Sequence, residues 1–222
     1  MAHYFDTLVN VSITGPLIRL DFGLALALSD DLPAASRERL QGLVAHIREL
    51  DELVLELLSY SRLQNPAQLP EQVEVSLDEF IDSILGSVDE ELESPEIVID
   101  VLLHGQLERF SLDPRLTARA IQNLLRNAMR YCDESLLLRL RLEGDGACLL
   151  TVEDDGIGIP VEERERIFQP FYRLDRSRDR NTGGFGLGLA ISRRAIEGQG
   201  GTLTLAQSAL GGAQFRIRLP AG

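Results

Sequence analysis

The feature of this sequence that most constrains its fold is an apolar seam between Ser36 and Leu63. Its members follow one another at alternating intervals of three and four residues: Leu40, Leu43, Ile47, Leu50, Val54 and Leu57. Charged residues such as Arg48-Glu49 and Asp51-Glu52 fill many of the positions between them. This spacing predicts a long helix that packs against other helices as in a coiled coil.

A second, shorter seam lies upstream and predicts a second helix. Its members are Ile13, Leu17, Leu20, Leu24 and Ala27. A turn with helix-start chemistry, residues 29–33, separates the two seams and makes the pair a helical hairpin. One hairpin does not easily bury such seams alone, so we expect two copies to form a dimeric four-helix bundle. The alternative is a hairpin that packs on the C-terminal part of its own chain.

The sequence divides into two regions of different character. A polar segment with two prolines, residues 64–71, predicts a linker between the hairpin, residues 1–63, and a second domain, residues 72–222. In that domain, strands are expected at 73–77, 97–103, 136–144, 148–154 and in the closing stretches TLTLAQS and QFRIRLP, and helices at about 78–93, 113–131, 161–168 and 187–198. This mixed order predicts an α+β fold built as a two-layer sandwich.

Two asparagines share one face of the helix expected over NLLRNAMRY. Asn123 and Asn127 lie four residues apart, and Tyr131 continues the same face. Asparagine is a poor helix former, so two on one face require an explanation. They form either a polar surface stripe or oxygen ligands for a Mg²⁺ ion that phosphates also hold.

The stretch VEDDGIGIP places carboxylates and glycines directly after a predicted strand. Asp154 could accept a hydrogen bond from an exocyclic amine, while Gly156 and Gly158 would let a base approach the backbone closely. By itself this motif is weak, because a tight turn after any strand can resemble it.

A second glycine-rich stretch, TGGFGLGLAI, leads into a helix through Gly184, Gly186 and Gly188. Free N–H groups at a helix N-terminus suit triphosphate oxygens. The motif is neither a Rossmann fingerprint, since no strand immediately precedes it, nor a P-loop, since GK[ST] is absent.

Between these two stretches lies a long segment, residues 167–184, without apolar periodicity. Phe168 and Phe171 could hold its first end against the core. Its basic residues are Arg173, Arg176, Arg178 and Arg180. In a chain of net charge −13 they indicate a lid over phosphates, although a solvated loop is the alternative.

In order and spacing these segments resemble the N, G1, F and G2 boxes of bacterial sensor histidine kinases, and are most similar to the EnvZ/RstB-like branch. Residues 198–205 and 211–220 resemble the closing hairpin of that family, and residues 57–63 the end of its second dimerisation helix. The resemblance implies a dimerisation hairpin followed by an ATP-binding domain with the GHKL, or Bergerat, two-layer α/β sandwich. It also implies ATP and Mg²⁺ as cofactors, a homodimer, and a cognate response regulator as partner.

Carried over by position, the resemblance implies a nucleotide site. Asp154 would bind the adenine amine, Asn127 would ligate Mg²⁺, and Asn123 would support the phosphates. The other nucleotide-binding positions would be Arg130, Tyr131, Gly156, Gly158, Phe171, Arg173, Arg178, Arg180, Gly184, Gly186, Leu187 and Gly188. Ala213 is a departure, because many members of the family carry Thr or Ser there, near the adenine.

The first helix departs from the family more seriously. Its H-box, HELRTP or HExxxP, carries the His that accepts the γ-phosphoryl group. Counting back five residues from Pro16 gives Val11 at the His position, with Ser12 in place of the acid and Gly15 in place of the Thr or Asn that assists dephosphorylation. A second alignment loses two residues, which would turn the upstream helix by about 200°. The histidines of the chain, none directly followed by an acid, are His3, His46 and His104.

The expected function is therefore that of the cytoplasmic part of a sensor histidine kinase with an ATP site and without its own phosphoacceptor. Two alternatives stay open: a non-catalytic, nucleotide-dependent module that binds a regulator, and a GHKL ATPase or serine kinase of the anti-sigma type. The acidic charge disfavours nucleic acid as a partner. No apolar run approaches the roughly 20 residues of a membrane span, so we expect the chain to be cytoplasmic. The family resemblance implies that upstream segments hold the full-length protein in the inner membrane.

Overall fold

The structure is a computed structural model that describes residues 15–29, 32–64, 70–89, 98–104, 109–142, 146–174 and 185–221. The chain divides into two compact units, Met1–Ser61 and Arg62–Gly222. The division into a hairpin, a linker and an ATP-binding domain at residues 63 and 71 stays a prediction, since much of the linker lies outside the described residues.

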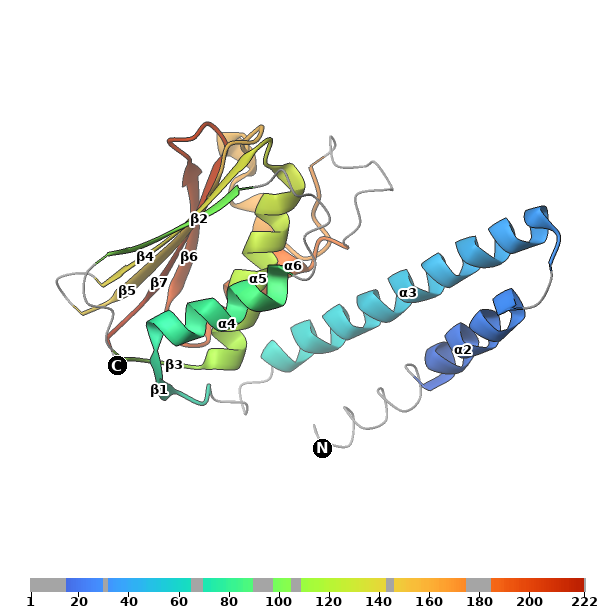
Figure 1. Ribbon diagram of the computed structural model, residues 1–222. Helices are drawn as coiled ribbons and strands as arrows, with labels where there is room; N and C mark the ends of the chain where they lie inside the picture. The colour runs from blue at the N-terminus through green and yellow to red at the C-terminus, as the bar shows by residue number, and fades with distance from the viewer. Residues whose placement is uncertain are drawn as a thin grey trace. The chain divides into compact units, whose positions relative to one another are not determined.

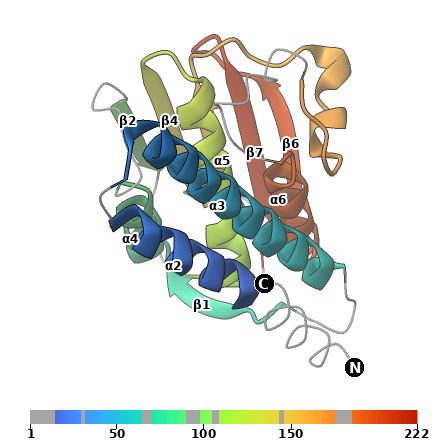
Figure 2. The ribbon, with the colours of Figure 1, turned by 90° about the vertical axis from the view of Figure 1, so that its right-hand side faces the viewer.

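The described residues of the first unit form two helices, as the seams predict. Helix α2 (Gly15–Ser29) and helix α3 (Ala34–Leu63) lie side by side as a hairpin (Figures 1 and 2). The carbonyl oxygen of Pro33 accepts bonds from the N–H groups of Ser36 and Arg37, at 2.9 and 3.0 Å, and so fixes the start of α3. With 30 residues, α3 is about 45 Å long.

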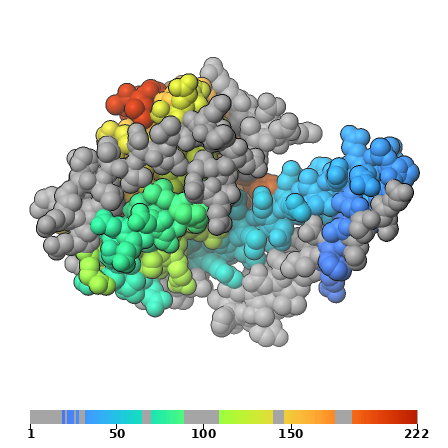
Figure 3. Space-filling view, viewed as in Figure 1, coloured from blue at the N-terminus to red at the C-terminus, as the bar shows by residue number. Residues whose placement is uncertain are grey.

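The seam of α3 is incompletely buried in one chain. Leu43 is 51% exposed, Leu50 50% and Leu57 38%, and on α2 Leu20 and Phe22 are also exposed. Figure 3 shows the outer surface of α3 in blue to cyan. The hairpin of a single chain therefore leaves apolar side chains in contact with water.

A five-stranded sheet forms the second unit. Its strand order is β2-β4-β5-β7-β6, in which β2 runs parallel to β4 and the other neighbours are antiparallel. The strands are β2 (Val98–His104), β4 (Ser135–Leu142), β5 (Cys148–Asp154), β6 (Thr202–Gln207) and β7 (Ala213–Leu219). A separate antiparallel pair joins β1 (Val73–Ser76) to β3 (Arg109–Leu112).

Three helices cover one face of this sheet (Figures 1 and 2). They are α4 (Leu77–Asp89), α5 (Pro114–Tyr131) and α6 (Gly188–Glu197). Ile121 and Leu124 of α5 are fully buried against a sheet that contributes Leu138, Val152 and Phe215 to the same core. Every second residue of β7 is apolar and faces this core, and β5 adds Cys148, Leu150 and Val152 to it. The predicted α+β sandwich is confirmed.

The structure differs from the sequence prediction at two elements. Residues 161–168 form two short 3₁₀ helices, η2 (Val161–Glu163) and η3 (Arg166–Phe168), because only Ile167 and Phe168 are buried and no continuous apolar stripe supports an α-helix. Strand β3 was not expected. It is four residues long and pairs with β1 outside the main sheet, so the sequence offered only a brief alternation around Phe110.

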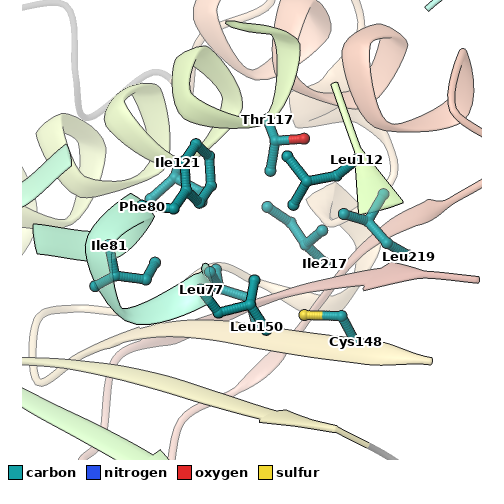
Figure 4. A pocket seen from close by; sticks show the side chains of 10 residues that line it. All are labelled: Leu77, Phe80, Ile81, Leu112, Thr117, Ile121, Cys148, Leu150, Ile217 and Leu219. Carbon is teal, nitrogen blue, oxygen red and sulfur yellow. The ribbon is translucent and has the colours of Figure 1, made fainter. Parts of the chain in front are cut away.

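A small cavity, about 10 Å³ in volume, interrupts the packing between α4, α5 and the sheet (Figure 4). Its lining is apolar apart from the hydroxyl of Thr117 and the thiol of Cys148. Burial raises the pKa of Cys148 to about 12. A space of this size has room for about one water molecule, so the cavity is a packing feature of the core.

Candidate functional site

Helix α5 begins at a strong local signal. Asp113 is its N-cap, and the carboxylate accepts bonds from the N–H groups of Arg115 at 3.0 Å and Leu116 at 3.1 Å. Pro114 occupies the first helical position, where a missing N–H costs nothing. The apolar stripe of the helix faces the core, and Asn123 and Asn127 are left half-buried.

The two predicted phosphate-binding motifs meet at Asn123. The amide Nδ2 of Asn123 donates to the carbonyl oxygen of Gly188, the first residue of α6, at 3.1 Å. A β-carbon added at Gly188 would lie 3.7 Å from Cγ of Asn123, in ordinary contact. The amide of α5 therefore lies directly against the N-terminus of α6.

At the end of β5, the carboxyl group of Asp154 is almost completely buried, with 2% of the residue exposed. Its Oδ1 accepts bonds from the N–H groups of Gly156 at 3.1 Å and Ala213 at 3.0 Å. Burial raises the pKa of Asp154, and these two bonds only partly oppose the shift. The result is a buried acceptor between the end of β5 and the start of β7.

Two glycines beside Asp154 are required for steric reasons. A β-carbon at Gly156 would lie 1.8 Å from the carbonyl oxygen of Tyr131, and one at Gly212 would lie 2.0 Å from Oδ1 of Asp154. Gly158 has a φ of +65°, which L side chains rarely adopt. The carbonyl group of Tyr131, at the end of α5, thus occupies the space that a side chain at position 156 would need.

Asp155, the next residue, holds the turn that follows α5. Its carboxylate accepts N–H bonds from Asp133, Glu134 and Ser135. Sequence reasoning assigned no role to this residue. The signal that could have found it was an acidic residue directly before a glycine, a pair that often bonds nearby backbone groups.

The two ends of the arginine-rich segment meet. The N–H of Phe171 donates to the carbonyl oxygen of Gly186 at 2.9 Å. Gly186 has a φ of +73°, and a β-carbon there would lie 2.8 Å from the carbonyl oxygen of Tyr172. Leu187, the N-cap position of α6, is fully buried, and its carbonyl oxygen accepts from Ile191 at 2.8 Å.

Of the two phenylalanines expected to hold this segment, one does so. Phe168 is buried and contacts the ring of Phe215 edge-on, with 6.4 Å between centroids. Phe171 is 59% exposed with a φ of 65°, so the expectation that it packs on the core is wrong. The hydroxyl of Tyr172 instead donates to the carboxylate of Glu163.

Several of the other predicted site residues are brought together in pairs, some are exposed, and some lie outside the described residues. The structure brings Asn123 against Gly188, Tyr131 against Gly156, and Phe171 against Gly186. Arg130 and Arg173 are exposed. Outside the described residues lie Val11, Ser12, Arg178, Arg180 and Gly184, while Gly15 is the first residue of α2. In the part of the chain that the structure describes, no group of three or more His, Cys, Asp or Glu side chains could hold a metal.

Comparison with known proteins assigns the chain to a family. Residues 112–222, which span α5 to β7, match the family described as histidine kinase-, DNA gyrase B- and HSP90-like ATPases. The sequence is 42% identical over 205 residues to the sensor protein RstB of Escherichia coli K12, covering 92% of this chain and 46% of RstB. The chain belongs to the sensor histidine kinases.

Further comparisons agree with this histidine kinase assignment. The E. coli sensor histidine kinase CpxA is 33% identical over 212 residues, covering 96% of this chain and 45% of CpxA. The chain thus spans about half the length of the curated relatives it matches. The crystal structure of full-length ShkA in complex with AMPPNP superposes with a TM-score of 0.79 at 23% identity, covers all of this chain and 44% of ShkA, and shows the same fold.

The chain carries a GHKL-type ATP-binding domain, as its sequence indicates. Among the described residues, none of its helices is both long and apolar enough to cross a membrane.

Proposed function

We propose that this chain is the dimerisation and ATP-binding part of a sensor histidine kinase, and that it binds Mg²⁺-ATP between α5, the end of β5 and the start of α6. The observation that carries the proposal is the buried carboxyl of Asp154, held within hydrogen-bond distance of two backbone N–H groups. A buried acceptor at the rim of a sheet suits the exocyclic amine of adenine. Guanine carries a carbonyl oxygen at the corresponding position and would meet this carboxylate unfavourably.

The phosphates would lie at the other end of the site. Asn123 already contacts the first residue of α6, whose N-terminus favours negative charge. Asn127, one helical turn further along α5, would ligate Mg²⁺, which when bound would neutralise charge on the phosphates. Arg178 and Arg180 would supply cations from the segment between Phe171 and Gly186.

Phosphoryl transfer requires an acceptor that this sequence lacks at the family position. In the proposed reaction the bond between the γ-phosphorus and the bridging oxygen breaks, a phosphorus–nitrogen bond forms on an imidazole, and ADP and the imidazole proton leave. Because Val11, Ser12 and Gly15 replace the H-box residues, we propose that the chain does not phosphorylate itself. In a mixed dimer, the H-box histidine of a relative would accept the group in trans and pass it to an aspartate of a response regulator.

The hairpin supports a homodimer as the working form. Leu43, Leu50 and Leu57 recur on α3 at coiled-coil spacing and are more than a third exposed in one chain. Pairing with a second hairpin would remove this apolar surface from water.

Calorimetry with ATP and Mg²⁺ tests the nucleotide site directly. The 222-residue chain should bind ATP in preference to GTP. Asp154→Asn should lower ATP affinity by about tenfold or more, because the buried acceptor loses its charge. Asp78→Asn, at an exposed carboxylate on the first turn of α4, is the matched control and should bind as the unaltered chain does. A chain that folds but binds neither nucleotide would exclude this function.

Labelling with γ-labelled ATP tests the transfer. The chain alone should gain no acid-labile label, whereas a mixed dimer with a relative that has an H-box histidine and a disabled ATP site should become labelled on that relative. Label on a histidine of this chain would contradict the loss of self-phosphorylation. If the mixed dimer forms and binds ATP without transfer, the chain acts instead as a nucleotide-dependent regulator-binding module.

A further inference from the structure

The turn between α5 and β4 is bound to the end of β5 by a single carboxylate. Asp155 accepts the N–H of Asp133 at 2.9 Å and that of Ser135 at 2.9 Å, and its two oxygens share the N–H of Glu134 at 3.3 and 3.2 Å. The N–H of Asp155 donates in return to the carbonyl oxygen of Ser135 at 3.3 Å. Three consecutive backbone donors thus converge on one side chain.

These bonds favour the ionised form of the side chain. Partial burial opposes ionisation of Asp155, but the backbone N–H bonds outweigh it and lower the pKa of this carboxyl. Charge-assisted bonds of this kind are shorter and roughly twice as strong as neutral ones. Both oxygens of Asp155 already accept hydrogen bonds, so the carboxylate is placed as an anchor rather than as a proton acceptor for a reaction.

The anchor lies between the two parts of the adenine end of the site. On one side, Asp154 directly precedes Asp155 and carries the buried acceptor. On the other, the turn that Asp155 holds begins at the end of α5, where the carbonyl oxygen of Tyr131 fills the space beside Gly156. Leu136 and Asp154 form the terminal pair of strands β4 and β5, and the turn lies next to this pair.

We propose that Asp155 is a positioning residue of the nucleotide site, which fixes Tyr131 and the end of α5 relative to Asp154 through the N–H groups of residues 133–135. This inference rests on the proposed function, because it names what sets the geometry of that same site. Asp155 touches no nucleotide. Without its carboxylate, the turn loses the bonds to the Asp155 side chain and keeps the backbone bond between Asp155 and Ser135, so the base-binding end of α5 is held less firmly relative to Asp154.

The test compares three variants of the 222-residue chain by calorimetry with Mg²⁺-ATP and Mg²⁺-GTP. Asp155→Ala removes all the acceptors, and we expect ATP affinity to fall about tenfold, the loss that follows from weakening one hydrogen bond to the bound ligand. The preference for ATP over GTP should shrink as well, because Asp154 and the end of α5 are the groups proposed to contact the base. Asp155→Asn keeps one acceptor oxygen and should recover part of both losses.

Asp133→Ala is the matched control. It removes a carboxylate of the same charge from the same turn and leaves the three N–H donors in place, so its nucleotide binding should equal that of the unaltered chain. Amide hydrogen exchange provides a second readout: residues 133–135 should exchange faster in both Asp155 variants without a general loss of protection.

The outcomes separate this inference from the function on which it rests. If the unaltered chain binds no ATP, the proposed function fails. If it binds ATP and Asp155→Ala binds equally well, or loses ATP and GTP by the same factor, Asp155 does not position the base-binding groups and the inference is overturned. Should Asp155→Ala not fold, Asp155→Asn decides in its place: weaker ATP preference supports the inference, and unchanged preference overturns it.

Discussion

Replacing Gly156 by alanine should damage both the stability of the domain and its nucleotide site. The added β-carbon would lie 1.8 Å from the carbonyl oxygen and 2.7 Å from the carbonyl carbon of Tyr131, whereas real β-carbons essentially never approach closer than 3.0 Å. The end of α5 must therefore retreat by about 1.2 Å from the loop after β5. Both groups are backbone, and the following turn is bound to Asp155, so the retreat breaks existing hydrogen bonds.

Overpacking of this kind costs about 1–3 kcal/mol, which lowers the melting temperature by about 2–4 °C for each kcal/mol. The same displacement separates Tyr131 from Asp154, so ATP affinity should fall by about tenfold or more. Gly86→Ala is the matched control: a β-carbon at Gly86 meets nothing within 4 Å, and alanine in the interior of α4 should add about 0.5–1 kcal/mol. Thermal unfolding and calorimetry measure both effects. A Gly156→Ala chain that melts as high as the unaltered chain and binds ATP as tightly would refute the steric argument.

Three further predictions concern other groups. Asp113→Ala should lower the free energy of unfolding in urea by about 2 kcal/mol, because it removes the N-cap of α5 and the acceptor of the Glu71 N–H; an unchanged urea midpoint would contradict this. Burial raises the pKa of Asp154 above its ordinary 3.8, so ATP affinity should fall as the pH drops through that raised pKa. Over the same pH interval the nucleotide-free chain should become more stable, because protonation of Asp154 removes a buried charge. An ATP affinity that does not change with pH in calorimetry would contradict this prediction. Burial raises the pKa of both thiols, with Asp155 and Asp154 contributing at Cys132, so at neutral pH alkylation followed by mass spectrometry should modify Cys132 slowly and Cys148 only after unfolding.

Most of the fold could be predicted because its elements carry long, regular patterns. Helix α5 combines an apolar stripe along its 18 residues with Asp113-Pro114 at its start, and β7 alternates apolar and polar side chains over seven residues. The errors fall where the pattern is short. Strand β3 has four residues, and residues 161–168 contain too few buried side chains to distinguish an α-helix from two 3₁₀ turns.

The site was predictable as a set of residues, but its contacts were not. The spacing of Asn123 and Asn127 placed them on one helix face, yet the bond from Asn123 to Gly188 joins residues 65 positions apart and depends on how α5 packs against α6. Glycine at 156 was expected to admit a base, whereas the structure supplies a different requirement, the carbonyl oxygen of Tyr131. The role of Asp155 could not be predicted from the sequence, because it depends on three backbone N–H donors in a turn about 20 residues earlier.

The bond between Phe171 and Gly186 has a consequence for how this domain can change in length. The N–H of Phe171 donates a hydrogen bond to the carbonyl oxygen of Gly186, and the glycine lies against the backbone of Phe171 and Tyr172. The two ends of the intervening segment are therefore held together by these terminal residues. Doubling the length of a flexible loop with fixed ends costs only about 0.6 kcal/mol. A change in the length of this segment therefore leaves the bond between Phe171 and Gly186 at its ends in place, whereas exchange of Arg178 or Arg180 would remove the cations proposed for the phosphates.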